Sequence, residues 1–273
     1  MELLEAEEVK LVRIVSEYVE AYDFEVYDIV GTILWFREHR IVMWTTIGLY
    51  LLGIYFGQKW MKNRPPFKLT FPLFFWNLGL ALFSIICTLR GIPELLYLLS
   101  KPDGMYQAAC VGPPHNFATS FWGLMIVLSK IVELGDTAFI ILRKQKLIAL
   151  HWFHHAATLL ICWIGYEYYE TGGRFMFINL FVHSFMYSYY AFKALGVKIS
   201  KNVSQALTTL QIAQLAYGVY VASSILYFWA QGRPCRMHFE TVSFSGSIIA
   251  IVLVLFIRFY KQSYTARDKI KMK

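Results

Sequence analysis

The sequence of 273 residues contains little charge. Only 16% of the residues are Asp, Glu, Lys or Arg, against about a quarter in an average soluble domain. At the same time 57% are hydrophobic, and the mean hydropathy is +0.46. A soluble globule of this length needs more polar surface than these residues supply. The composition therefore argues against a water-soluble fold and indicates a surface that contacts lipid.

Cysteine is also scarce. There are four Cys residues, with no Cys-x-x-Cys pair and no zinc-ligand spacing, so we expect neither a disulfide scaffold nor a structural zinc. The first eight residues are acidic and lack the positive charge and apolar run of a secretory signal, so no cleaved signal peptide is expected. The net charge of +8 arises from short basic runs between apolar blocks. Because these runs form no continuous face, nucleic acid is not an expected partner.

Uncharged stretches long enough to cross a bilayer recur along the chain. The seven candidate spans are residues 41–58, 69–89, 117–142, 147–166, 174–192, 203–230 and 241–258. Before residue 41, apolar residues at helical spacing (Val12, Val15, Val19) with mixed charge predict an interfacial or lumenal helix. The expected fold is all-α: an N-terminal segment (1–40), a seven-helix polytopic membrane domain (41–260) and a basic tail (261–273).

The distribution of Lys and Arg predicts how the chain is oriented. With the C-terminus cytosolic, sixteen of these residues fall in cytosolic segments and nine in the opposite ones, which is the positive-inside bias. The N-terminus is then lumenal. The sequon at Asn202 lies on the cytosolic side and should carry no glycan. Cys110 and Cys235 lie in loops on the oxidising side, where a disulfide is feasible. The tail Lys269–Lys273 fits a cytosolic retrieval signal.

Polar side chains inside the spans are the candidate functional residues, because lipid excludes them unless they have a role. Four spans contain such groups: Lys130-x-x-Glu133-x-x-Asp136-Thr137, His151-x-x-His154-His155, Asn179-x-x-x-His183-x-x-Met186-Tyr187-x-Tyr189-Tyr190 and Thr208-x-x-Gln211-x-x-Gln214. Counted from the cytosolic end of each span, Asp136, His154, His183 and Gln211 lie roughly 10 to 15 Å deep. We therefore expect one polar layer that opens toward the basic face, with the three His of the fourth span on one wall.

Each of these sets also has a purely structural interpretation. His183 alone could be a hydrogen-bonded packing residue, and Lys130, Glu133 and Asp136 could neutralise one another along one helix. The two Gln residues could join helices by hydrogen bonds, and the Tyr residues after position 186 could belong to an interfacial belt. Three His within five residues of a span are not readily explained by packing.

Three activities fit a histidine cluster in a membrane. A di-iron desaturase or hydroxylase needs roughly eight His ligands, whereas this chain has seven in total, of which His39, His115 and His238 lie outside the polar layer. A seven-helix receptor has a pocket that opens outward, opposite to the layer expected here. The third activity is acyl transfer. Burial favours neutral imidazole, which is the form that attacks a thioester.

The four motifs, in this order and spacing, resemble the signatures of the very-long-chain fatty acid elongases, over about residues 22 to 261. The resemblance implies a 3-oxoacyl-CoA synthase of the endoplasmic reticulum membrane that joins acyl-CoA to malonyl-CoA with release of CO2, without a cofactor or metal. It implies seven helices around an acyl tunnel and a ping-pong mechanism in which His154 becomes acylated. His151, His155 and His183 would orient it, shuttle protons or hold the malonyl unit. Reductase and dehydratase enzymes are possible partners.

We expect substrate contacts from the remaining motif residues and from the basic face. These are Lys130, Glu133, Asp136, Asn179, Tyr187 and Gln211, with Arg143, Lys144 and Lys193 for the anionic coenzyme A. The sequences of Glu133–Lys144 and His151–His155 resemble those of the elongase branch that acts on saturated and monounsaturated chains of palmitoyl range. A rival nucleophile is Cys162, two turns deeper on the His155 face, because soluble condensing enzymes use Cys.

Overall fold

The computed structural model describes residues 15–111 and 115–265, and within these ranges the chain forms helices and no strand. The long helices are α3 (Arg40–Met61), α4 (Thr70–Leu99), α6 (Phe117–Glu133), α8 (Ala149–Glu167), α9 (Met176–Ala194), α10 (Lys201–Ala230) and α11 (Phe239–Tyr260). Shorter elements are η1 (Asp23–Glu25), α2 (Ile29–Glu38), α5 (Gly104–Tyr106), η2 (Gln107–Val111), α7 (Gly135–Leu142), η3 (Thr171–Phe175) and η4 (Lys261–Thr265). The all-α fold predicted from the sequence is confirmed.

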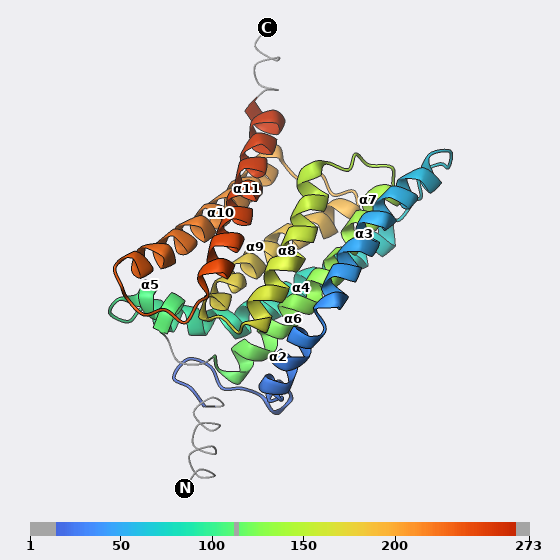
Figure 1. Cartoon of the computed structure of the whole chain (residues 1–273). Coiled ribbons are helices and arrows are strands. Elements are labelled where there is room, and N and C mark those ends of the chain that lie inside the picture. Colours follow the sequence, from blue (N-terminus) through green and yellow to red (C-terminus); the bar gives the residue numbers. More distant parts are fainter. Residues whose placement is uncertain (1–14, 112–114, 266–273) are drawn as a thin grey trace.

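Four helices are long and apolar enough to cross a membrane: α3, α4, α10 and α11 continued into η4. The chain is therefore a membrane protein, since such helices satisfy all their backbone hydrogen bonds within lipid. The helices α6, α8 and α9 lie between these four in Figure 1. They are shorter, and they hold the charged and His-containing motifs.

Two pairs of helices approach each other closely at a glycine. On α4, a Cβ at Gly91 would lie 2.0 Å from the Phe177 ring of α9, so only glycine fits this contact. On α11, a Cβ at Gly246 would lie 3.0 Å from the Cβ of Ala222 on α10. The α10 and α11 helices form a hairpin on one side of the bundle, at the left of Figure 1, and α8 lies between α11 and α6.

Two spans differ from their predicted bounds. The helix α4 continues to Leu99, nearly three turns past the predicted end at residue 89, because its polar side chains find partners there. Arg90 pairs with Glu25, and Glu94 pairs with Arg174. The predicted span 117–142 breaks at Leu134 into α6 and α7.

The helix predicted around Val12, Val15 and Val19 is wrong for its described part. Residues 15–22 are irregular, and Val12 lies outside the described residues. Hydrogen bonds from distant side chains replace those of a helix here. The Asn116 amide donates to the Val19 carbonyl at 3.3 Å, and Arg90 donates to the Glu20 carbonyl at 2.8 Å. The helix before residue 41 is instead α2.

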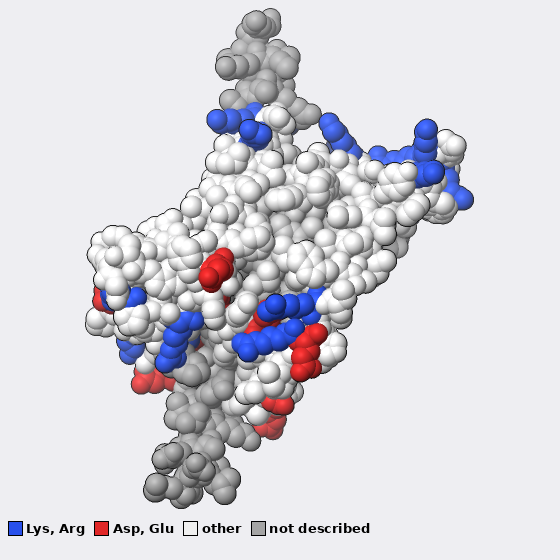
Figure 2. Space-filling model, viewed as in Figure 1, with Lys and Arg blue, Asp and Glu red and all other residues white. Residues whose placement is uncertain are grey.

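The two ends of the bundle differ in charge. On the face shown in Figure 2, the end where α3 and α11 finish has Lys and Arg only, whereas the opposite end has residues of both signs. We call these the basic end and the mixed-charge end. The tail motif Lys269–Lys273 lies outside the described residues.

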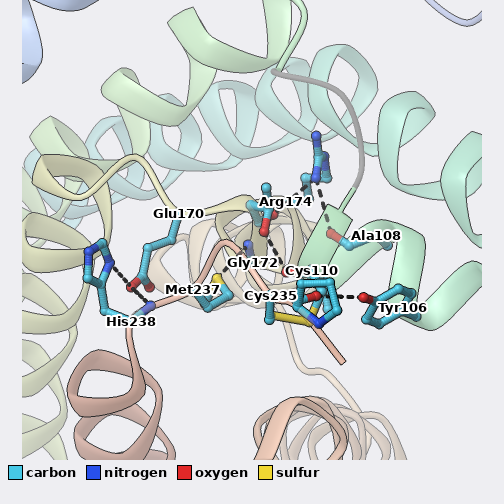
Figure 3. Close-up of a disulfide and its surroundings, with 12 residues drawn as sticks. Tyr106, Ala108, Cys110, Glu170, Gly172, Arg174, Cys235, Met237 and His238 are labelled. Carbon is cyan, nitrogen blue, oxygen red and sulfur yellow. Dashed lines mark hydrogen bonds and ion pairs between the residues drawn. A yellow bond between two sulfur atoms is a disulfide. The ribbon is translucent and has the colours of Figure 1, made fainter. Parts of the chain in front are cut away.

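At the mixed-charge end, charged groups are buried and paired. Arg174 and Glu94 are fully buried and form an ion pair, and His115 Nδ1 lies 2.8 Å from a Glu94 oxygen. Burial, reinforced by the nearby Arg174 guanidinium, lowers the pKa of His115. The feasible disulfide between Cys110 and Cys235 is present here and joins η2 to the loop between α10 and α11 (Figure 3).

Candidate active site

A cavity of about 910 Å³ lies in the half of the bundle nearer the basic end. We call it the polar cavity. Side chains from all four sequence motifs line it: Asp136, His151, His154, His155, Asn179, His183, Tyr187, Tyr189, Tyr190, Thr208, Gln211 and Gln214. The structure thus brings these residues together from α7, α8, α9 and α10.

The three histidines of α8 form one wall of the polar cavity because they share one face of the helix. The ring centroids of His151 and His155 are 4.4 Å apart, and those of His154 and His155 are 5.5 Å apart. His151 Nε2 lies 3.0 Å from the Thr137 hydroxyl, which in turn lies 2.8 Å from the Tyr50 hydroxyl. This chain of contacts fixes the orientation of the His151 ring.

Asp136 is held by donors from two other helices. Trp76 Nε1 on α4 donates to one carboxylate oxygen at 2.6 Å, and the Tyr187 hydroxyl on α9 donates to the other at 2.9 Å. His155 Nε2 lies 3.9 Å from the second oxygen. The carboxylate therefore lies directly behind the His155 ring, where it can orient that ring or accept a proton relayed through it.

Lys130 and Glu133 lie behind the polar cavity rather than in its wall. Both are almost fully buried, and Lys130 Nζ donates to the two Glu133 oxygens at 2.9 and 3.1 Å. The ammonium also donates to Asn179 Oδ1 at 3.1 Å, and Asn179 Nδ2 lies 3.3 Å from His183 Nε2. The charges of Lys130 and Glu133 neutralise one another, as one sequence interpretation allowed, and the same contacts orient two residues that do line the cavity.

A second, apolar cavity of about 230 Å³ continues from the first toward the mixed-charge end. It is lined on α8 by Thr158, Ile161, Cys162 and Gly165 and on α10 and α11 by small and aliphatic residues. On α8, α9, α10 and α11 alike, its lining residues lie nearer the mixed-charge end than those of the polar cavity. We call it the apolar cavity.

The two cavities meet at a small set of residues that line both: His154, Asn179, Gln214 and Leu215. His154 is half-buried, and its ring lies edge-on to Phe256 of α11 with centroids 6.2 Å apart. Within the described part of the chain, no hydrogen bond ties its imidazole to another side chain. The ring can therefore contact a bound group where the polar cavity meets the apolar cavity.

The basic residues predicted at the mouth are only partly in place. Arg143 and Lys193 line the polar cavity, together with Lys201. Lys144 instead donates to the Lys62 carbonyl at 3.0 Å and is not part of the lining. The backbone at Lys144 is left-handed, and its contact with coenzyme A stays a prediction.

Some lining and supporting residues were missed from the sequence. Trp76 and Tyr50 orient Asp136 and Thr137, yet neither belongs to a recognised motif. Asn77 lines the polar cavity and is a buried amide within a span, a signal that could have been noticed. Tyr264 of η4 lines the polar cavity at the basic end, and its hydroxyl lies 3.2 Å from the Thr208 hydroxyl.

Within residues 15–111 and 115–265, no three His, Cys, Asp or Glu side chains converge as a metal ion would require. The histidines instead contact hydroxyl, amide and carboxylate groups of the protein. What the arrangement offers chemically is a nucleophile or base at His154, flanked by two further imidazoles and an oriented carboxylate.

Comparisons with known proteins find relatives over most of the chain. The model of the ELO: GNS1/SUR4 family matches residues 35–272. Very long chain fatty acid elongase 6 of Homo sapiens is 38% identical over 252 residues, which cover 91% of this chain and 94% of that protein. Elongase 6 of Drosophila melanogaster is 37% identical, covering 93% and 82% respectively. Very long chain fatty acid elongase 3 of Homo sapiens is 36% identical and covers 95% of both chains.

Proposed function

This chain belongs to the ELO: GNS1/SUR4 family of fatty acid elongases, and from that premise we propose that it catalyses the condensing step of elongation. In this reaction acyl-CoA, malonyl-CoA and a proton give 3-oxoacyl-CoA, coenzyme A and CO2. The observation that carries the proposal is that His154 lies where the polar and apolar cavities meet. A long-chain thioester has one polar and one apolar part, and such a junction places its carbonyl carbon beside the imidazole.

The first half-reaction is attack of a neutral His154 nitrogen on the thioester carbonyl. A carbon–nitrogen bond forms, the carbon–sulfur bond breaks, and the coenzyme A thiolate leaves and takes up a proton. His155 lies next to His154, and Asp136 lies behind His155, so these two residues supply a path for protons to and from the site. His151, which is oriented by Thr137, belongs to the same wall of the polar cavity.

In the second half-reaction malonyl-CoA loses CO2, and the resulting enolate carbon attacks the acyl carbon and releases imidazole. An enolate oxygen needs hydrogen-bond donors that are already in place. We assign this role to Asn179, His183 and Gln211, which line the polar cavity. Lys130 and Glu133 act as positioning residues, because they hold Asn179.

Coenzyme A is multiply anionic, so we place its phosphates at Arg143, Lys193 and Lys201 at the basic end. This end is then cytosolic and the mixed-charge end, with the disulfide, is lumenal in the endoplasmic reticulum. The orientation requires that residues 41–260 cross the membrane seven times, with α6 and α7 together, α8 and α9 as the remaining crossings. Reductases and a dehydratase would then act on the product at the same membrane.

The acyl chain occupies the apolar cavity, and saturated or monounsaturated chains of palmitoyl range are the proposed substrates. Support comes from the apolar lining and from the sequences of Glu133–Lys144 and His151–His155, which resemble that branch of the family. Each buried methylene contributes about 0.8 kcal/mol, so a lined slot of limited length both binds and selects chains.

The test uses the purified full-length protein with malonyl-CoA labelled in its free carboxyl group and a series of acyl-CoAs. The proposal predicts release of labelled CO2 that depends on the acyl-CoA and yields a product two carbons longer. Activity should persist with iron chelated and without a reductant. No CO2 release with any chain, or oxidation of the chain in the presence of iron and reductant, would overturn the proposal in favour of desaturase chemistry.

A further inference from the structure

The loop between α10 and α11 contains four consecutive residues that are each fixed to another part of the fold. We call residues 235–238 the strap. Cys235 forms the disulfide with Cys110, and the Arg236 amide donates to the Cys110 carbonyl at 3.0 Å. Met237 and His238 contact the segment between α8 and α9. Short loops joining helices are usually the most mobile parts of a fold, so four anchored positions in a row need an explanation.

The side of the strap that faces the bundle is anchored to the segment between α8 and α9. The Gly172 amide donates to the Met237 sulfur at 3.2 Å, and the His238 amide donates to a Glu170 oxygen at 3.1 Å (Figure 3). A Cβ at Gly172 would lie 2.7 Å from the terminal methyl carbon of Met237. Glycine at this position thus lets Met237 lie directly against the backbone.

Met237 is also part of the wall of the apolar cavity, whereas Cys235, Arg236 and His238 are not. It follows the end of α10 and precedes α11, so it lies at the mixed-charge end, opposite to His154. The thioether packs against the cluster formed by Tyr106, Cys110 and their neighbours. The strap therefore presents a single long, flexible side chain to the far end of the cavity and holds its backbone still.

We propose that Met237, held by the strap, is the end wall that determines the longest acyl chain the protein elongates. The inference rests on the proposed function, since it identifies the far end of the slot that begins at His154. A chain that is too long must displace the thioether or leave its last carbons outside the slot. Each methylene that is not buried in the apolar cavity lowers relative kcat/KM by about fourfold. A difference of two carbons lowers relative kcat/KM by a factor on the order of ten.

The experiment compares relative kcat/KM across saturated acyl-CoAs that increase by two carbons. Met237→Ala shortens the side chain that the strap presents to this end of the cavity and should raise the longest chain accepted by about two carbons, with a gain on the order of tenfold for that chain. Met237→Trp adds bulk and should move the limit in the opposite direction. Met125→Ala on α6 removes the same atoms at a position that does not line the cavity, so its chain-length profile should match that of the unsubstituted protein.

A second pair of variants tests the strap itself. Releasing it with Cys110→Ser and Cys235→Ser together should broaden the chain-length limit without moving the preferred chain, because the thioether stays but its backbone is no longer held. Unchanged limits in both Met237 variants, with normal elongation of the shorter chains, would overturn the inference while leaving the proposed function intact. Failure of the unsubstituted protein to elongate any chain would instead count against the proposed function.

Discussion

The two cavities share the helices α8, α9, α10 and α11 and differ in the residues that each of these helices presents. Along one face of α8, three histidines line the polar cavity, and the next two turns present Thr158, Cys162 and Gly165 to the apolar cavity. The polar cavity measures about 910 Å³ and the apolar cavity about 230 Å³. The chemistry and the recognition of the chain are thus separated along the helix axis, with His154 at the boundary. Substitutions on either side should therefore alter different kinetic parameters.

The largest effect is expected at the boundary itself. His154→Ala removes the proposed nucleophile and should lower condensation by a factor on the order of 10³ or more, measured as malonyl-dependent CO2 release. Cys162→Ala, in the apolar cavity, should leave the rate of condensation close to normal. If the Cys162 variant were inactive and the His154 variant active, the nucleophile would be assigned to the wrong cavity.

A substitution within the apolar cavity should change chain selection and leave the chemistry intact. A Cβ at Gly165 meets nothing within 4 Å, and the residue lines the cavity, so Gly165→Leu places its side chain in the path of the acyl group. We expect a loss of about tenfold for palmitoyl-CoA relative to much shorter chains. Gly53→Leu, on the exposed surface of α3 where a Cβ is also unhindered, is the matched control. Equal losses for all chains in the Gly165 variant would indicate misfolding rather than selection.

Substitutions of basic residues at the mouth of the polar cavity should weaken the binding of coenzyme A without changing the chemical step. Lys193→Ala and Lys201→Ala should each raise KM for acyl-CoA by about two- to fivefold, and the difference should shrink as salt is added, because the contacts are electrostatic. The comparison variant is Lys59→Ala on α3, which lies outside the cavity. An altered kcat with unchanged KM would mean that these lysines act on the chemistry instead.

The smallest effect on activity is expected at the mixed-charge end. Arg90 and other donors lower the pKa of Glu25 although burial opposes this shift, so the ionised form is the one that stabilises the fold. That stability is fully present above the ordinary pKa of the carboxyl and is lost as the pH falls through its lowered value. Glu25→Gln should cost about 1–3 kcal/mol of unfolding free energy at neutral pH and flatten the acid limb of the melting temperature. A melting profile identical to that of the unsubstituted protein would contradict this.

Most residues of the polar cavity could be predicted from the sequence, whereas those of the apolar cavity could not. His151, His154 and His155 are easily recognised because ionisable groups are rare within apolar spans. The depth of Asp136 or Gln211 then follows from the helical rise. Glycines and aliphatic residues such as Gly165 are common in every span, so nothing in the sequence distinguishes those that line a cavity from those that face lipid.

Contacts between distant segments were also beyond prediction. The irregular course of residues 15–22 depends on Asn116 and Arg90, which lie far away in the sequence. Likewise, the position of Lys144 depends on its contact with the end of α3. Local periodicity and charge counts carry no information about such partners.

The most direct test of the account is to identify the acylated side chain. The purified protein is mixed with palmitoyl-CoA in the absence of malonyl-CoA, quenched rapidly, digested and analysed by mass spectrometry. The account predicts a palmitoyl group on His154 that disappears when malonyl-CoA is added. An acyl group on Cys162, or condensation that proceeds in full with no acylated residue at any time, would contradict it.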